Sequence, residues 1–208
     1  MESWERYLVY SIGFLSQGLF AARLIVQWIL SEREGKVVSP VIFWQLSLFA
    51  SYLFILYGIL QNDFVIILGQ ALAYVIYVRN LQLEGAWRTF PRHFKYISII
   101  LPAATIAWVL LAGMSGFSYR TLIHPVVMAG AAGQMLLNIR FVYQWYYSER
   151  VGGSLFPVGF WYMTTFGSLC VVVYAIYFFD PVLLAAQGLG LVASLRNIQL
   201  HFKTKEAG

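Results

Sequence analysis

The chain has 208 residues, of which 60% are hydrophobic and 11% are charged. A soluble domain carries about twice that fraction of charged residues, so the composition excludes an ordinary soluble protein and indicates one that lies within a membrane. The net charge of +5 does not indicate nucleic-acid binding, because the basic residues gather in short segments between apolar stretches, as they do in the loops of membrane proteins.

Seven apolar stretches are long enough for helices that cross a bilayer, which takes about 20 residues each. Short polar turns, Asn62-Asp63 and Asp180-Pro181, join the second stretch to the third and the sixth to the seventh. We therefore predict an all-α integral membrane protein with seven transmembrane helices and with its termini on opposite sides. In chain order the helices are expected at residues 7–30, 41–61, 64–82, 95–113, 121–147, 157–178 and 182–200.

Lysine and arginine predict the orientation, because they gather in cytoplasmic loops. The N-terminal side and the even-numbered loops hold Arg6 and Arg120. We therefore expect the N-terminus outside and the C-terminus in the cytoplasm. The ten basic residues on the expected cytoplasmic side are Arg33, Lys36, Arg79, Arg88, Arg92, Lys95, Arg150, Arg196, Lys203 and Lys205.

The sequence repeats itself without gaps. Adding 117 to any position from Gly13 to Leu83 gives its partner between Gly130 and Leu200, and 27 of these 71 pairs are identical. Chance does not produce such a match, whereas duplication of a three-helix segment does. The repeat therefore divides the predicted helices into two copies of three.

Because each copy has an odd number of helices, an unpaired fourth helix is needed to give both copies the same orientation. We predict a 3+1+3 plan of parallel repeats: a first copy at 7–84, a linker with the unpaired helix at 85–120 and a second copy at 121–203. Transporters often place a pathway where two repeats meet. The alternative is that the duplication only makes a stable bundle.

Two arginines lie inside predicted helices. Arg23 and Arg140 each precede a Ser-Glu-Arg motif by eight residues, which places them about 12 Å inside the helix end. Such a charge usually faces a cavity or a partner, and guanidinium suits the bidentate binding of phosphate. One interpretation is a central site that holds a phosphate head group. The other is that each arginine extends to the interface or pairs with its own Glu32 or Glu149.

Glutamines accompany these arginines at equivalent positions of the two copies. Gln27 follows Arg23 by four residues, on the same helix face. We predict that such amides line a polar substrate path together with the arginines. Alternatively, they form interhelical hydrogen bonds that hold the bundle together. The six candidate residues are Gln17, Gln27, Gln70, Gln134, Gln144 and Gln187.

Residues typical of enzymes and metal sites do not form a recognisable pattern. The nine acidic residues fall at helix ends or in loops, and the three histidines do not have the spacing of metal ligands. The sequence contains neither a phosphate-binding glycine loop nor a paired acid and base. Arg79-Asn80 and Arg196-Asn197 end the third helix of each copy, where cations complement the helix dipole. We expect no metal, no cofactor and no enzymatic activity.

The repeated motif resembles the lipid A biosynthesis N-terminal domain family. In the first copy the resemblance rests on Gln17, Arg23, Gln27-Trp28, Ser31-Glu32-Arg33, Pro40, Phe43-Trp44, Asp63, Gln70 and Arg79-Asn80, and the second copy, Gln134 to Asn197, resembles the family again. The 3+1+3 plan is also similar to that of the SWEET and PQ-loop transporters. The Pro-Gln pair of that group is absent, so its sugar-transport residues do not carry over.

The resemblance implies a multi-pass component of the bacterial inner membrane that acts in envelope glycolipid metabolism. The expected ligand is a membrane lipid or a polyprenyl-phosphate sugar, and the expected activity is its translocation between leaflets. Two alternatives stay open. The chain is a non-catalytic partner of a lipid-dependent membrane glycosyltransferase, or it is a SWEET-like carrier of free sugar. Nothing in the chain resembles a soluble glycosyltransferase, and the sequence does not determine an oligomeric state.

Overall fold

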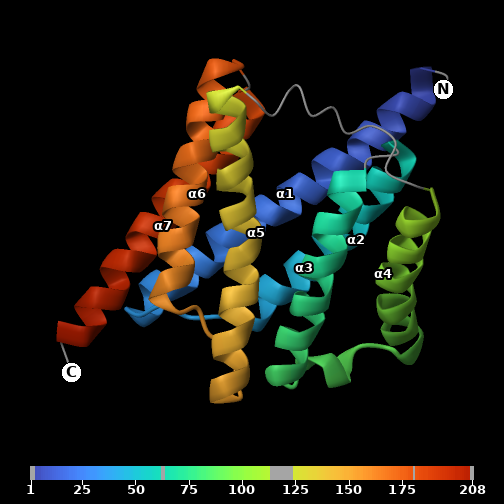
Figure 1. Ribbon diagram of the computed structural model, residues 1–208. Coiled ribbons are helices and arrows are strands. Elements are labelled where there is room, and N and C mark those ends of the chain that lie inside the picture. Colours follow the sequence, from blue (N-terminus) through green and yellow to red (C-terminus); the bar gives the residue numbers. More distant parts are fainter. Residues whose placement is uncertain (1–2, 62–63, 113–123, 180, 207–208) are drawn as a thin grey trace. The chain divides into compact units, whose positions relative to one another are not determined.

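The computed structural model describes residues 3–61, 64–112, 124–179 and 181–206, and these residues form helices and connecting loops (Figure 1). The all-α prediction and its seven long helices are confirmed, with boundaries close to those expected. A short 3-10 helix, η1, precedes the fourth. In chain order the elements are α1 (Ser3–Glu34), α2 (Val41–Gln61), α3 (Phe64–Leu83), η1 (Ala86–Thr89), α4 (Arg92–Ala112), α5 (Pro125–Val151), α6 (Val158–Tyr177) and α7 (Pro181–Glu206).

Four of the helices, within the part of the chain that the structure describes, are long and apolar enough to cross a membrane. They are α1, α2, α5 and α6, the first two helices of each copy. A membrane crossing by all seven helices, the SWEET-like arrangement and the orientation of the termini stay predictions. The turns predicted at Asp63 and Asp180, and the loop that contains Arg120, lie outside the described residues.

Glycine ends the first helix of both copies. Gly35 follows α1 with φ of 64° and Gly152 follows α5 with φ of 71°. This left-handed conformation strains any residue with a Cβ and is the usual way to end an α-helix. The Gly152 N–H donates to the carbonyl oxygen of Ser148 at 3.0 Å. The conserved glycine therefore explains why both copies turn at the same point of the repeat.

The described contacts divide the chain into two compact units, and the boundary runs through α1. Unit 1 contains residues 1–23 and 41–116, whereas unit 2 contains residues 24–40 and 117–208. The first helix of the first copy thus contributes its last turns to the unit built from the second copy. This division differs from the three sequence domains, which stay a prediction.

In unit 1, the beginning of α1 packs on α2 through small and aromatic residues. Ser16 donates a hydrogen bond from Oγ to the carbonyl oxygen of Ala50 at 2.7 Å. One turn later, Phe20 meets Phe54 edge to face, with 6.1 Å between the ring centroids. Helices α2, α3 and α4 then follow side by side in chain order (Figure 1). Small residues let helix backbones approach closely, as is usual in membrane bundles.

In unit 2, two glycines bring α5 and α6 together. A Cβ added at Gly133 would lie 2.7 Å from the carbonyl oxygen of Gly167, and one added at Gly167 would lie 2.9 Å from that of Gly133. These positions are the equivalents of Ser16 and Ala50 in the first copy. The same helix crossing is therefore made by a serine hydrogen bond in one copy and by direct backbone contact in the other.

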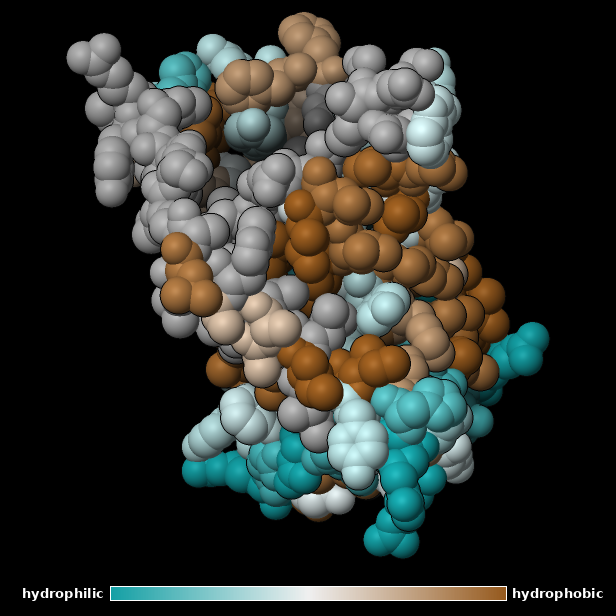
Figure 2. Space-filling model, turned by 90° about the vertical axis from the view of Figure 1, so that its right-hand side faces the viewer, coloured by the Kyte–Doolittle hydropathy of each residue, from teal (hydrophilic) through white to brown (hydrophobic). Residues whose placement is uncertain are grey.

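Apolar side chains lie on the surface and polar side chains lie inside, a distribution that suits the interior of a membrane. Large apolar side chains such as Phe14 and Phe166 are more than 60% exposed, whereas Gln27, Ser51 and Asn197 are fully buried. Soluble monomers rarely expose extended apolar surface, but in lipid this distribution satisfies the polar groups inside the protein. Figure 2 shows one face on which hydrophobic residues gather in a broad zone and hydrophilic residues gather beyond one end of it.

The close approach of α5 and α6 predicts a large effect of one methyl group. Gly133→Ala is expected to lower the free energy of unfolding by about 1–3 kcal/mol, because its Cβ would overlap the backbone of α6. Gly188→Ala in α7 is the matched control, since its Cβ meets no atom within 4 Å. Thermal unfolding in detergent would contradict this packing if both variants melted at the same temperature.

Candidate functional site: an arginine centre in each copy

Arg23 lies on α1 and is held by hydroxyl groups of the next two helices in unit 1. Its Nη1 donates to Ser47 Oγ of α2 at 2.8 Å and to Tyr77 Oη of α3 at 3.0 Å. The side chain is only 7% exposed. Ser47 Oγ donates its own proton to the carbonyl oxygen of Phe43 at 2.6 Å. The hydroxyl therefore presents a lone pair to the guanidinium.

Aromatic rings complete the Arg23 centre. The guanidinium carbon Cζ lies 4.5 Å from the ring centroid of Phe20, 5.1 Å from that of Phe43 and 5.5 Å from that of Tyr77. Each ring attracts the cation through its negative face, an interaction that strengthens when water is excluded. Hydroxyls and rings thus replace part of the hydration that Arg23 loses on burial, and they also fix the position of its charge.

The second copy builds a related centre around Arg140 in unit 2. Its Nη1 donates to Thr164 Oγ1 at 2.9 Å, and its Cζ lies 5.2 Å from the ring centroid of Phe160. Thr164 and Phe160 occupy the positions of Ser47 and Phe43 in the repeat. Both copies therefore place an arginine against a hydroxyl and a phenylalanine of the following helix.

The two centres differ at the position of Tyr77, whose phenol oxygen accepts a hydrogen bond from Arg23. Ser194 stands where the first copy has Tyr77, and its hydroxyl lies 2.8 Å from that of Thr165. Arg140 is half-buried, whereas Arg23 is buried. The prediction that both guanidinium groups share one central cavity stays a prediction, because each is described within its own unit.

The arginine centres use residues that the sequence did not single out. Ser47 and Thr164 differ in identity, so a search for identical residues passes over them. The available signal was a hydroxyl retained four residues after Phe43 and Phe160, a spacing that places both groups on one helix face.

Gln27 and Gln144 fix the loop that follows their own helix. Gln27 Nε2 donates to Ser31 Oγ at 2.9 Å, and Gln144 Nε2 donates to Ser148 Oγ at 2.7 Å. The same amide groups reach the carbonyl oxygens of Val38 and Leu155, at 3.3 and 3.0 Å. Both glutamines are fully buried. These contacts favour the bundle-holding interpretation over sugar recognition.

Gln70 and Gln187 join neighbouring helices in the two copies. Ser51 Oγ donates to Gln70 Oε1 at 3.0 Å, and Ser168 Oγ donates to Gln187 Oε1 at 3.1 Å. The four residues are identical between the copies, so this interhelical hydrogen bond survived the duplication. These contacts too favour the bundle-holding interpretation.

Gln17 and Gln134 lie apart from these networks. Both side chains are exposed, and within the part of the chain that the structure describes neither forms a hydrogen bond with a residue of the arginine centres. The eight predicted site residues thus fall into three groups: two arginine centres, four glutamines in structural hydrogen bonds and two glutamines on the surface.

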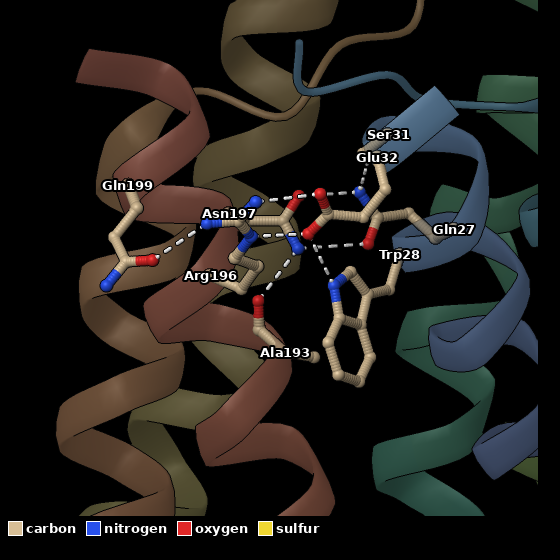
Figure 3. A network of polar contacts seen from close by, with 8 residues as sticks. All are labelled: Gln27, Trp28, Ser31, Glu32, Ala193, Arg196, Asn197 and Gln199. Atoms are coloured by element: carbon tan, nitrogen blue, oxygen red, sulfur yellow. Dashed lines mark hydrogen bonds and ion pairs between the residues drawn. The ribbon is translucent and has the colours of Figure 1, made fainter. Parts of the chain in front are cut away.

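The end of α1 is bound to α7 of unit 2 by a polar network (Figure 3). The side-chain amides of Gln27 and Asn197 donate to each other, at 2.9 and 3.2 Å. Glu32 forms an ion pair with Arg196, through Nε and through Nη2, and accepts a hydrogen bond from Trp28 Nε1 at 3.0 Å. Glu32 is therefore the partner of Arg196 and not, as one interpretation of the sequence held, of Arg23.

The Ser-Glu-Arg motif gains a physical explanation from this network. Gln27 reaches Ser31 and Trp28 reaches Glu32, each across four residues of one helix. The second copy repeats both pairs, since Gln144 reaches Ser148 and Trp145 Nε1 donates to Glu149 Oε1 at 2.8 Å. The spacing of these pairs was visible in the sequence and predicts such contacts.

Comparison with known proteins decides the family. The family model described as the Lipid A Biosynthesis N-terminal domain matches residues 12–82 and again residues 129–199. The chain belongs to this family. Each matched segment contains one arginine centre, so both copies of the lipid A biosynthesis N-terminal domain retain it, and the predicted internal repeat is confirmed.

Curated relatives of this family member are longer proteins. It is 29% identical to a protein of Chlamydia pneumoniae named lipid-A-disaccharide synthase, over 97% of this chain and 35% of the relative. It is 30% identical to a protein of the same name from Chlamydia felis, over 95% of this chain and 34% of the relative. The chain thus spans about a third of the length of these relatives. No solved structure matches it.

The network at the end of α1 predicts unequal effects of two substitutions. Gln27→Leu is expected to lower the free energy of unfolding by about 1–3 kcal/mol, because it leaves the buried Oδ1 of Asn197 without the donor that Gln27 supplies. Glu32→Gln removes an ion pair that is exposed to solvent, and such pairs add little to stability, so its effect is expected to be smaller. Denaturation of both variants in detergent checks the order. A larger loss for Glu32→Gln would contradict it.

Proposed function

We propose that this protein moves a polyprenyl-phosphate-linked sugar, or a related phosphate-bearing glycolipid, between the leaflets of the bacterial inner membrane. The observation that supports the proposal best is the Arg23 centre, a buried cation positioned by two hydroxyls and three aromatic rings. A charge at this depth is costly and commonly marks a substrate pathway.

The chemistry of the centre favours a phosphate as the ligand. Guanidinium stays charged in proteins and presents its N–H donors in one plane, which suits bidentate contact with a phosphate. Both hydroxyl partners of Arg23 accept from the same nitrogen, Nη1, so they set the direction of that plane. The family supports a lipid-linked ligand, since its name refers to lipid A biosynthesis.

In this proposal the phosphate of the carrier lipid binds an arginine centre while its hydrocarbon tail stays in the bilayer. Movement is downhill and is driven by consumption of the lipid on the far side. The chain acts without a cofactor, and the protein is not an enzyme in its own right. The N-terminus lies in the periplasm and the C-terminus in the cytoplasm.

Removal of either arginine charge tests the proposal. Arg23→Gln and Arg140→Gln should each slow exchange at least about tenfold, since a hydrogen bond to a charged group is worth roughly 1.5–3 kcal/mol. The assay follows a fluorescent polyprenyl-phosphate hexose in proteoliposomes, with a membrane-impermeant quencher outside. Arg88→Gln, at an exposed position of η1, is the control and should exchange the lipid at the original rate.

Folding of each variant is checked by its melting temperature before its exchange rate is compared. A folded Arg23→Gln protein that exchanges the lipid as fast as the original would refute the phosphate site. Uptake of a free sugar that does not depend on either arginine would instead support a SWEET-like carrier.

A second function is favoured by the relatives. Proteins about three times as long, named lipid-A-disaccharide synthase, contain a region similar to nearly the whole chain. This supports a non-catalytic partner that holds a lipid substrate for a membrane glycosyltransferase. Co-purification with such an enzyme, together with absence of lipid exchange by the isolated chain, would favour this function over translocation.

A further inference from the structure

Three tyrosines and an arginine form a stripe along the end of α5. Tyr143, Tyr146, Tyr147 and Arg150 follow one another at helical spacings of three and four residues, which places them on one face. Tyr146 and Arg150 are exposed, and Tyr147 is 37% exposed. We call these four residues the tyrosine stripe.

The rings of the stripe contact one another and the cation. The centroids of Tyr143 and Tyr147 lie 4.8 Å apart, and those of Tyr146 and Tyr147 lie 5.6 Å apart. Arg150 lies over the ring of Tyr146, with its Cζ 4.4 Å from the centroid. Stacking of this kind orients a guanidinium and leaves its N–H donors at the edge of the plane.

A glycine of the next helix makes room for the stripe. A Cβ added at Gly159 of α6 would lie 2.5 Å from Tyr143 Oη and 2.7 Å from ring atoms of the same residue. Tyr143 therefore rests directly on the backbone of α6, and any larger residue at position 159 would displace it.

The first copy does not contain this arrangement. Val26, Ile29 and Leu30 stand at the equivalents of the three tyrosines, and Ile42 stands at the equivalent of Gly159. In the second copy the large residue Tyr143 faces the small residue Gly159. The first copy has Val26 and Ile42 at these positions, so there the residue of the second helix is the larger one. Arg33, the equivalent of Arg150, is retained.

We propose that the tyrosine stripe binds the head group of an anionic phospholipid at the membrane surface. Arg150 supplies the positive charge, and in the part of the chain that the structure describes no carboxylate forms an ion pair with it. The phenol groups supply hydrogen-bond donors, while their rings rest among the upper parts of the acyl chains, as tyrosines do at membrane interfaces.

This site is distinct from the arginine centres and does not depend on the translocation proposal. Glu149 lies next to Arg150 in the chain, but it accepts a hydrogen bond from Trp145, and the equivalent pair of Trp28 and Glu32 is present in the first copy. The acidic residue is thus common to both copies, whereas the tyrosines are confined to the second.

The duplication supplies matched variants for the test. Arg150→Gln removes the cation, and the double variant Tyr146→Ile with Tyr147→Leu installs the residues of the first copy. Arg33→Gln is the control for loss of a charge at the equivalent position. Phosphatidylglycerol and phosphatidylcholine retained by the 208-residue chain are counted by native mass spectrometry after release from detergent.

The original protein should retain phosphatidylglycerol in preference to phosphatidylcholine. Arg150→Gln should lower phosphatidylglycerol affinity about fivefold, the effect expected for one basic residue at an anionic surface, and the tyrosine double variant should lower it similarly. Arg33→Gln should change it less than about twofold. Arg88→Gln should also change it less than about twofold, and Arg150→Gln should exchange the polyprenyl-phosphate hexose at the original rate, which separates this site from the translocation proposal.

Three results would overturn the proposal. Equal retention of both lipids would remove the preference for an anionic head group, and an equal loss in Arg33→Gln would show a general effect of net charge. A particle that halves in mass when the tyrosines are replaced would show that the stripe joins two copies of the chain instead of binding lipid.

Discussion

A polar group that leaves water for the interior of a membrane protein needs partners supplied by the protein itself. Arg23 imposes this requirement most strongly, since its guanidinium cannot shed its charge. The guanidinium finds these partners on α2 and α3, where Ser47 and Tyr77 accept its hydrogen bonds and aromatic rings lie against it. The contacts of this one cation therefore join three helices of unit 1. The same contacts form the charged centre on which the proposed function rests.

Comparison of the two copies separates what this requirement preserves from what it allows to change. The arginine, the phenylalanine and a hydroxyl are retained, as are the serine and glutamine that join the next pair of helices. The crossing of the first two helices differs between the copies, since one uses a serine hydrogen bond and the other a pair of glycines. The two copies thus share the contact of the arginine with a hydroxyl and the contact of the serine with the glutamine, but not the helix crossing or the phenol.

Much of the fold could be predicted from the sequence, because helix length, apolar runs and a repeat without gaps are local or periodic signals. The identities of Arg23 and Arg140 as interior charges followed from their depth in the helix. Their partners Ser47 and Thr164 did not, because a hydroxyl in an apolar helix has many possible acceptors and donors. Pairs four residues apart, such as Trp28 with Glu32, were predictable, whereas the bond from Gln27 to Asn197 depends on folding across 170 residues.

The passage of α1 from one unit to the other makes the second copy depend on the first. Gln27 belongs to the first copy and Asn197 to the second, and their amides bond within unit 2. A cut between the two copies would therefore leave the second one incomplete, since the buried amide of Asn197 would lose the hydrogen bonds of Gln27 although the sequence of the second copy was intact.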